Sequence, residues 1–148
     1  MQVTRRQALG LAAGAVVASI VPLTARAAAA DAEKMMMEFT GGKTPEAGKI
    51  TLTAPEIAEN GNTVPVSVSV ESAMSGDDLV EAVMILAEDN PSPGVATFHF
   101  TEMSGKAEAT TRIRLAKTQN VLAVARMKGG AVFIDKKQVK VTIGGCGG

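Results

Sequence analysis

Aromatic residues are scarce in this chain: it has no tryptophan, no tyrosine and only four phenylalanines. A core must therefore be built from Val, Ile, Leu, Met and Ala, which bury less area per residue than aromatic rings do. A length of 148 residues favours a single domain. With a formal net charge of zero and few rings for stacking, the sequence also predicts no nucleic-acid binding.

Histidine and cysteine, the side chains most often used in catalysis and metal binding, are equally scarce: the chain has one of each. His99 alternates with Phe98 and Phe100, so it is predicted to face away from them at a surface or interface. A lone histidine is a poor metal site. The consecutive residues Met35–Met37 do not converge on one ion, because helical neighbours point about 100° apart. We therefore predict no metal, no cofactor and no active site of the chain's own.

The first thirty residues have the pattern of an export signal. The pair Arg5 and Arg6 precedes an uncharged run from Leu9 to Leu23, which is shorter than the roughly 20 residues of a membrane span. Small residues follow, and cleavage after Ala27 and after Ala30 are both consistent with them. The paired arginines indicate the twin-arginine route, so the mature protein is expected in the periplasm and free of the membrane.

Removal of this signal changes the net charge of the chain, and export would place the single cysteine in an oxidising compartment. Arg5, Arg6 and Arg26 leave with it, and acidic residues then outnumber basic ones by three, because the whole chain has 15 of each. An oxidising compartment favours paired cysteines. Cys146 has no internal partner, so it is expected to be used, either with a substrate or in an intermolecular disulfide.

The mature chain has the period-two pattern of β-strands. Valines at 64, 66, 68 and 70 alternate with polar residues, and 83–87 has the continuous apolar pattern of a strand buried on both faces. Further strands are expected at 50–53, 95–101, 109–115, 121–128, 131–135 and 138–143. We predict an all-β, immunoglobulin-like sandwich of seven or eight antiparallel strands over 31–143, preceded by a short helix at about 32–39.

The last residues, Gly144-Gly145-Cys146-Gly147-Gly148, have a different character. Residues without a Cβ do not hold a strand or a helix, so residues 144–148 are predicted to form a mobile, slender arm. From Ile143 to Cys146 the extended chain spans at most about 10 Å. That distance is enough to place the thiol in a partner's pocket while the sandwich stays outside.

No group near Cys146 in the sequence would activate its thiol. A free cysteine has a pKa of about 8.5, and catalytic cysteines sit in electropositive surroundings. The pattern therefore favours a non-catalytic carrier whose reactivity is supplied by an enzyme. The alternative is a structural or interaction domain that forms an intermolecular disulfide through Cys146.

The terminal motif Gly144 to Gly148 resembles that of the SoxY family, the carriers of bacterial thiosulfate oxidation. The segments Phe39-Thr40-Gly41-Gly42-Lys43 and 55–65 are similar to the mature amino-terminal region of that family. The resemblance identifies Cys146 as the attachment site and Gly144, Gly145, Gly147 and Gly148 as its arm.

The same resemblance implies partners and chemistry that composition does not reveal. It implies a heterodimer with SoxZ, a second β-sandwich. A haem enzyme would join thiosulfate oxidatively to the cysteine as an S-thiosulfonate, a thiosulfohydrolase would release sulfate, and a sulfane dehydrogenase would oxidise the remaining sulfur.

Overall fold

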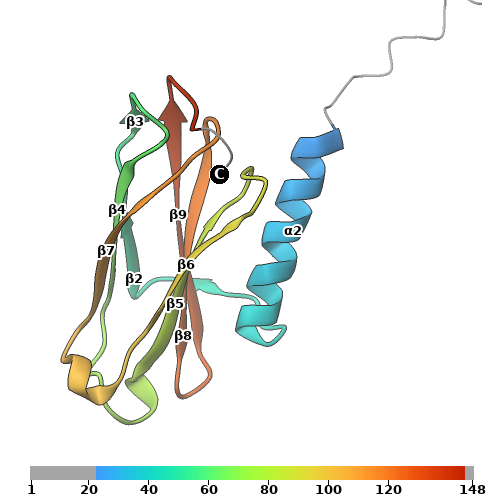
Figure 1. Ribbon diagram of the computed structural model, residues 1–148. Helices are drawn as coiled ribbons and strands as arrows, with labels where there is room; N and C mark the ends of the chain where they lie inside the picture. Colours follow the sequence, from blue (N-terminus) through green and yellow to red (C-terminus); the bar gives the residue numbers. More distant parts are fainter. Residues whose placement is uncertain (1–22, 146–148) are drawn as a thin grey trace, which may run out of the picture.

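The computed structural model describes residues 23–145, which form one helix packed against a β-sandwich of two sheets (Figure 1). The large sheet has the strand order β1-β9-β8-β5-β6, with β3 also paired to β9, and the small sheet has the order β2-β4-β7. The elements are α2 (Leu23–Thr40), β1 (Glu46–Ala47), β2 (Ile50–Thr53), β3 (Ile57–Ala58), β4 (Val64–Val70), η1 (Gly76–Asp78), β5 (Val80–Ala87), β6 (Gly94–His99), η2 (Glu102–Ser104), β7 (Ala107–Ile113), β8 (Gln119–Met127) and β9 (Val132–Val141).

The core between the sheets is aliphatic, as the scarcity of aromatic residues predicts. The four valines of β4 at 64, 66, 68 and 70 are all buried on its inner face. They meet buried side chains of β5 and β8, and Phe98 and Phe100 only border the cluster. Alternation of period two therefore places one face of the small sheet inside and the other in solvent.

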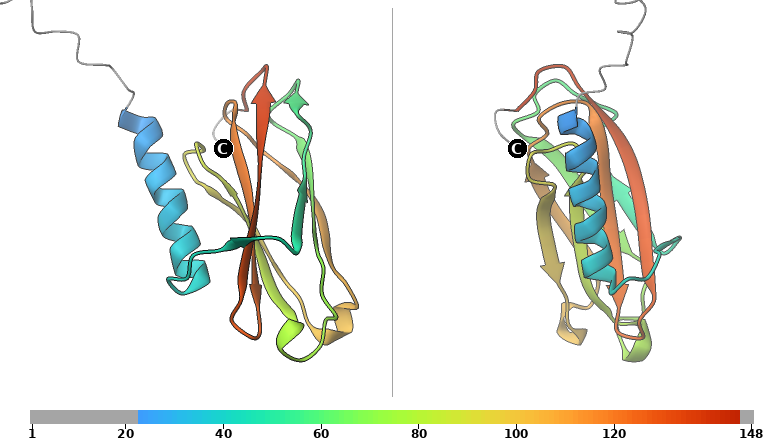
Figure 2. Two further views of the ribbon diagram at one scale, coloured as in Figure 1. Left: turned by 180° about the vertical axis from the view of Figure 1, so that it is seen from behind. Right: turned by 90° about the vertical axis from the view of Figure 1, so that its right-hand side faces the viewer.

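Strand β5 is buried on both faces, which explains its continuous apolar sequence. It is paired with β6 and β8 inside the large sheet. Its Val83 and Ile85 belong to the core between the sheets, while Ala82 and Met84 pack under α2 with Phe39. The helix thus covers the outer face of the large sheet, as both views of Figure 2 show.

Helix α2 extends further toward the amino terminus than the sequence analysis expects. It begins at Leu23 rather than near Ala32, because the alanines that are also candidate cleavage sites are strong helix formers. The predicted cleavage sites after Ala27 and Ala30 both lie within this helix, and either cut would leave Phe39 and Met36 packed on the sheet. Within residues 23–145, no helix is long and apolar enough to cross a membrane.

Two details of the predicted strands are wrong: the bounds of the last segments and the purely antiparallel pairing. The segments expected at 131–135 and 138–143 form one strand, β9, which ends at Val141. The two-residue strands β1 and β3 run parallel to β9, so the sandwich is not purely antiparallel. Both strands are too short for an alternation of polar and apolar residues to be recognised. They raise the number of strands in residues 23–145 to nine, against the seven or eight predicted. The β-sandwich itself, consistent with the immunoglobulin-like type, is confirmed.

Candidate functional site: the base of the C-terminal arm

The predicted site residues fall partly outside the structure. Gly144 and Gly145 are described, while Cys146, Gly147 and Gly148, like Arg5 and Arg6, lie outside the described residues. The site that the structure shows is therefore the base of the arm, the residues that directly precede Cys146 and the loops around them. It lies at the end of the sandwich where β9 finishes, at the top of Figure 1.

Hydrogen bonds hold the chain after β9 against the loop that follows β3. The amide of Thr142 donates to the carbonyl of Ala58 at 3.1 Å. The hydroxyl of Thr142 donates to the carbonyl of Glu59 at 3.0 Å. The strand has ended by this point, but its parallel pairing with β3 continues as single bonds.

One residue further on, two backbone hydrogen bonds connect Ile143 and Gly145 to two loops, and a third joins the loops to each other. The amide of Gly61 donates to the carbonyl of Ile143 at 2.8 Å, and the carbonyl of Gly61 accepts from the amide of Leu115 at 2.8 Å. The carbonyl of Leu115 then accepts from the amide of Gly145 at 2.9 Å. We call this set of three bonds the arm clamp. It links the β3–β4 loop, the β7–β8 loop and the arm.

Glycine is required here for space. A Cβ on Gly144 would overlap the carbonyl oxygen of Ala116, and a Cβ on Gly145 would lie 3.0 Å from the carbonyl oxygen of Gly61. A Cβ on Gly61 would overlap the carbonyl oxygen of Leu115 and lie 2.7 Å from the amide nitrogen of Gly145. None of the three glycines has a positive φ, so close backbone approach and not turn geometry explains them.

The predicted mobility of residues 144–148 stays a prediction, but the structure adds a contact at the base of this arm that the sequence analysis did not expect. Gly144 and Gly145 are held to the sandwich by the backbone, without any side chain of their own. The sequence analysis missed the clamp, and it included Gly61 only as one residue of the segment 55–65. Hydrogen bonds between main chains leave little trace in residue type.

A buried amide side chain supports the β7–β8 loop of the clamp. Asn90 is 2% exposed. Its Nδ2 donates to the carbonyl of Arg114 at 2.8 Å, and its Oδ1 accepts from the amide of Ala116 at 3.0 Å. Asn90 therefore fixes the residues on both sides of Leu115, whose carbonyl receives the arm.

The surface beside the arm base carries two exposed aliphatic side chains. Ile143 is 68% exposed and Ile57 is 58% exposed. Ile57 is paired with Lys140 near the end of β9, so both isoleucines lie at the same end of the sandwich. These two side chains make the surface beside Gly145 partly apolar.

The other residues considered from the sequence lie away from the arm base. His99 is exposed, as predicted, and lines an open hollow with Glu81, Met103 and Arg126. Met36 packs from α2 against the large sheet as expected, while Met37 is 37% exposed. Among residues 23–145, no group of three or more His, Cys, Asp or Glu side chains could hold a metal ion.

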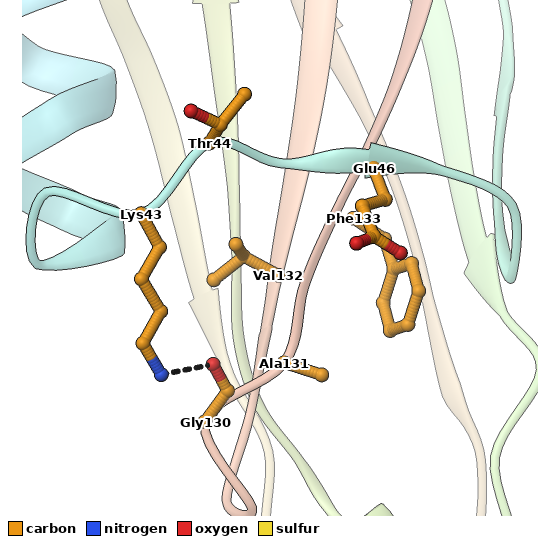
Figure 3. Close-up of a pocket in the computed structure, with 7 residues that line it drawn as sticks. All are labelled: Lys43, Thr44, Glu46, Gly130, Ala131, Val132 and Phe133. Atoms are coloured by element: carbon orange, nitrogen blue, oxygen red, sulfur yellow. Dashed lines mark hydrogen bonds between the residues drawn. The ribbon is translucent and has the colours of Figure 1, made fainter.

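A second hollow lies beside the β8–β9 turn, at the end of β9 remote from the arm (Figure 3). Its volume is about 340 Å³, and the backbone of β1 forms one rim. Lys43 donates from Nζ to the carbonyl of Gly130 at 2.7 Å across its edge. Thr44 and Glu46 also line the hollow, and its one cation among the lining residues, Lys43, is already hydrogen-bonded.

The acidic pair at 77–78 has a structural role. Asp78 lies 2.7 Å from Lys49 Nζ and accepts from the amide of Ala73 at 2.6 Å. The hydrogen bond from Lys49, followed by that from Ala73, holds the pKa of Asp78 below its usual value. These contacts join β2 to η1 and lie far from Gly145.

Comparison with known proteins agrees with this fold. The solved structure of the sulfur carrier protein SoxY from Chlorobium limicola f thiosulfatophilum is 30% identical in sequence, with a TM-score of 0.66. The match covers 80% of this chain and 99% of that one. No curated protein matches the sequence significantly.

Superoxide reductases share the sandwich at a greater distance. The neelaredoxin of Ignicoccus hospitalis is 17% identical, with a TM-score of 0.54, over 64% of this chain and 80% of that one. Likeness at this level concerns the fold alone.

The model of the family described as sulfur oxidation protein SoxY matches residues 36–146, from α2 through the single cysteine. Together with the solved relative, this shows a sulfur-carrier role in sulfur oxidation. The chain belongs to the SoxY family.

Proposed function

We propose that this protein carries sulfur covalently on Cys146, as thiosulfate-derived adducts that it presents to partner enzymes. The single observation that carries the proposal is that the family match includes Cys146, the only cysteine of the chain. The structure adds support, because the chain that leads to this cysteine leaves a rigid sandwich at its tip.

The proposed loading step is an oxidation. The thiol of Cys146 and the outer sulfur of thiosulfate form a sulfur–sulfur bond, giving an S-thiosulfonate; one proton and two electrons are released. A haem enzyme accepts the electrons. Hydrolysis with one water then breaks the bond to the sulfonate, and it yields sulfate, a proton and a persulfide on Cys146.

The proposed role of the protein in these steps is presentation. Charge stabilisation and proton transfer belong to the partner enzymes, since the described residues around Gly145 contribute backbone groups and two exposed isoleucines. We propose that Ile57 and Ile143 contact each enzyme while the cysteine enters its site. A sulfane dehydrogenase would oxidise the remaining sulfur.

Assembly and location complete the proposal. A SoxZ-like β-sandwich is the proposed heterodimer partner, as membership of the SoxY family implies. The paired Arg5 and Arg6 support export by the twin-arginine route and a periplasmic location. No resident cofactor or metal is proposed.

Substitution of the cysteine tests the function. We expect Cys146→Ser to abolish thiosulfate-dependent turnover in a reconstituted pathway, because serine cannot form the sulfur–sulfur bond. Thermal stability should be unchanged, and circular dichroism provides the control. Appreciable turnover by the serine variant would end the carrier proposal and leave the disulfide-linked interaction domain as the better account.

A further inference from the structure

The arm clamp centres on a residue far from the cysteine in sequence. Gly61 is buried, and both of its backbone polar groups are used: the amide bonds Ile143, and the carbonyl receives Leu115. The carbonyl of Leu115 then bonds Gly145. The β3–β4 loop is therefore hydrogen-bonded directly to Ile143, and it is connected to Gly145 through Leu115.

We propose that Gly61 is a positioning residue for Cys146: it holds the base of the arm on the sandwich, and the arm is released from it for transfer. This inference rests on the proposed carrier function and adds to it a second, retracted position of the arm. Gly61 acts through Gly145 and touches no substrate.

The requirement for glycine at this position follows from space. The φ of Gly61 is not positive, so alanine suits its conformation, but a Cβ there would overlap the carbonyl oxygen of Leu115. The same Cβ would lie 2.7 Å from the amide nitrogen of Gly145 and 3.0 Å from Cγ1 of Val141. One added methyl group thus presses on the loop, the arm and the end of β9 together.

The clamp decides how far the thiol can travel. With Gly145 bonded to Leu115, the last anchored residue is one peptide before Cys146, and the Cα of Cys146 lies about 3.8 Å from this anchor. When the bond of Gly145 opens, Ile143 becomes the last anchored residue, and the extended reach from the anchor to Cys146 rises to about 10 Å. A thiol that must enter a deep site therefore needs the clamp to open.

Release requires little else to be broken. Gly144 and Gly145 have no side chains to pack, and Ile143 is already 68% exposed. The clamp holds this segment only through the bonds Gly61–Ile143 and Gly145–Leu115, because the third bond joins the two loops to each other. Such bonds can open and close without unfolding the sandwich.

Hydrogen exchange at the amide of Gly145, measured by NMR on the full chain, tests the clamp directly. In the wild-type protein, exchange at this amide is expected to be slowed on the order of tenfold, which corresponds to the net free energy of one backbone hydrogen bond. Gly61→Ala should reduce this protection to nearly none while the amides of β8 stay protected. If Gly145 exchanges at the unprotected rate in wild type, or stays protected in Gly61→Ala, the clamp is overturned.

Two further variants separate the clamp from general stability. Val68→Ala makes a cavity in the core, since Val68 is 2% exposed, and should lower the melting temperature without changing protection at Gly145. Gly144→Ala, whose Cβ would overlap the carbonyl of Ala116, attacks the clamp from the arm side. This variant should also lose protection at the amide of Gly145, and it can replace Gly61→Ala in the experiment if that variant does not fold.

Transfer kinetics test the release. For the loading enzyme in a reconstituted pathway, Gly61→Ala should lower the KM for the carrier by up to about tenfold and leave kcat unchanged, since the fraction of competent arm rises. An unchanged or raised KM with lost protection would overturn the release. Hydrogen exchange does not depend on sulfur chemistry, so failure of the carrier function itself would show only in Cys146→Ser.

Discussion

Gln119 donates from Nε2 to Oδ1 of Asn90 at 2.8 Å, and both side chains are almost completely buried. The same Oδ1 accepts from the amide of Ala116. Buried amides of this kind are retained where they satisfy main-chain groups that have no other partner. Here they fix the β7–β8 loop, which carries the acceptor of the arm.

Removal of the Asn90 side chain should destabilise the protein. Asn90→Ala leaves the amide of Ala116, the carbonyl of Arg114 and one Gln119 donor without this partner. We expect a loss of about 1–3 kcal/mol in the free energy of unfolding, measured by urea denaturation. Ser92→Ala, in the same turn but exposed, should change it by less than about 0.5 kcal/mol. Equal effects of the two variants would contradict this structural role.

Acid should weaken the contact between β2 and η1. The lowered pKa of Asp78 means that its ionised form is favoured by folding. Its contribution to stability is therefore present above the ordinary aspartate pKa of 3.8 and is lost as the pH falls through the lower pKa of the folded state. Asp78→Asn should flatten this part of the curve of unfolding free energy against pH.

Asp77→Asn is the matched control for that measurement. It removes the same charge at the neighbouring position and keeps the bond from the amide of Gly129 to the carbonyl of residue 77. If both variants flatten the curve equally, general charge and not the contact of Asp78 with Lys49 and Ala73 governs the acid response.

Bulk on the arm should impair transfer more than folding. We expect Gly145→Val and Gly147→Val to lower turnover with each partner enzyme by about tenfold or more, because added width beside Cys146 hinders entry into a narrow channel. The free energy of unfolding should change by no more than about 1 kcal/mol, the net contribution of one backbone hydrogen bond. Steady-state kinetics and thermal melts provide the two readouts.

Alanine distinguishes width from flexibility at these positions. If alanine is tolerated and valine is not, channel width dominates; failure of both points to flexibility. Gly147 provides the cleaner comparison, because a Cβ on Gly145 also approaches the carbonyl oxygens of Gly61 and Leu115. Normal turnover by every variant would refute the need for a slender arm.

Mild oxidation should link two copies of the purified protein. An unpaired thiol has no internal partner here, so slow formation of a disulfide dimer is expected, reversible by reductant. Non-reducing electrophoresis follows the reaction, and Cys146→Ser should stay monomeric under the same conditions. A native thiol that resists both oxidation and alkylation would mean that Cys146 is inaccessible.

The strands with a clear period were predictable from the sequence. The alternating valines of 64–70 and the continuous run of 83–87 indicated one half-buried and one fully buried strand, and both are confirmed. The two-residue strands at 46–47 and 57–58 could not be found this way, because pairing so short leaves no pattern. The segments expected at 131–135 and 138–143 left out Lys136 and Lys137, where β9 continues with exposed side chains.

The geometry of the candidate site was only partly predictable. The glycines around Cys146 indicated an arm, since residues without side chains are slender and unrestrained. The same lack of side chains allows close docking against the carbonyl oxygens of Leu115 and Ala116, which depends on loops distant in sequence. Nothing local to residues 144–145 encodes the position of those loops.

The central claim is that Cys146 carries sulfur, and a mass spectrum of the intact protein from cells grown on thiosulfate tests it most directly. The carrier account predicts adducts of thiosulfonate and persulfide mass on Cys146, removed by reductant and missing from protein of cells grown without reduced sulfur. Protein that is unmodified, or modified only as a Cys146-linked dimer, would contradict it.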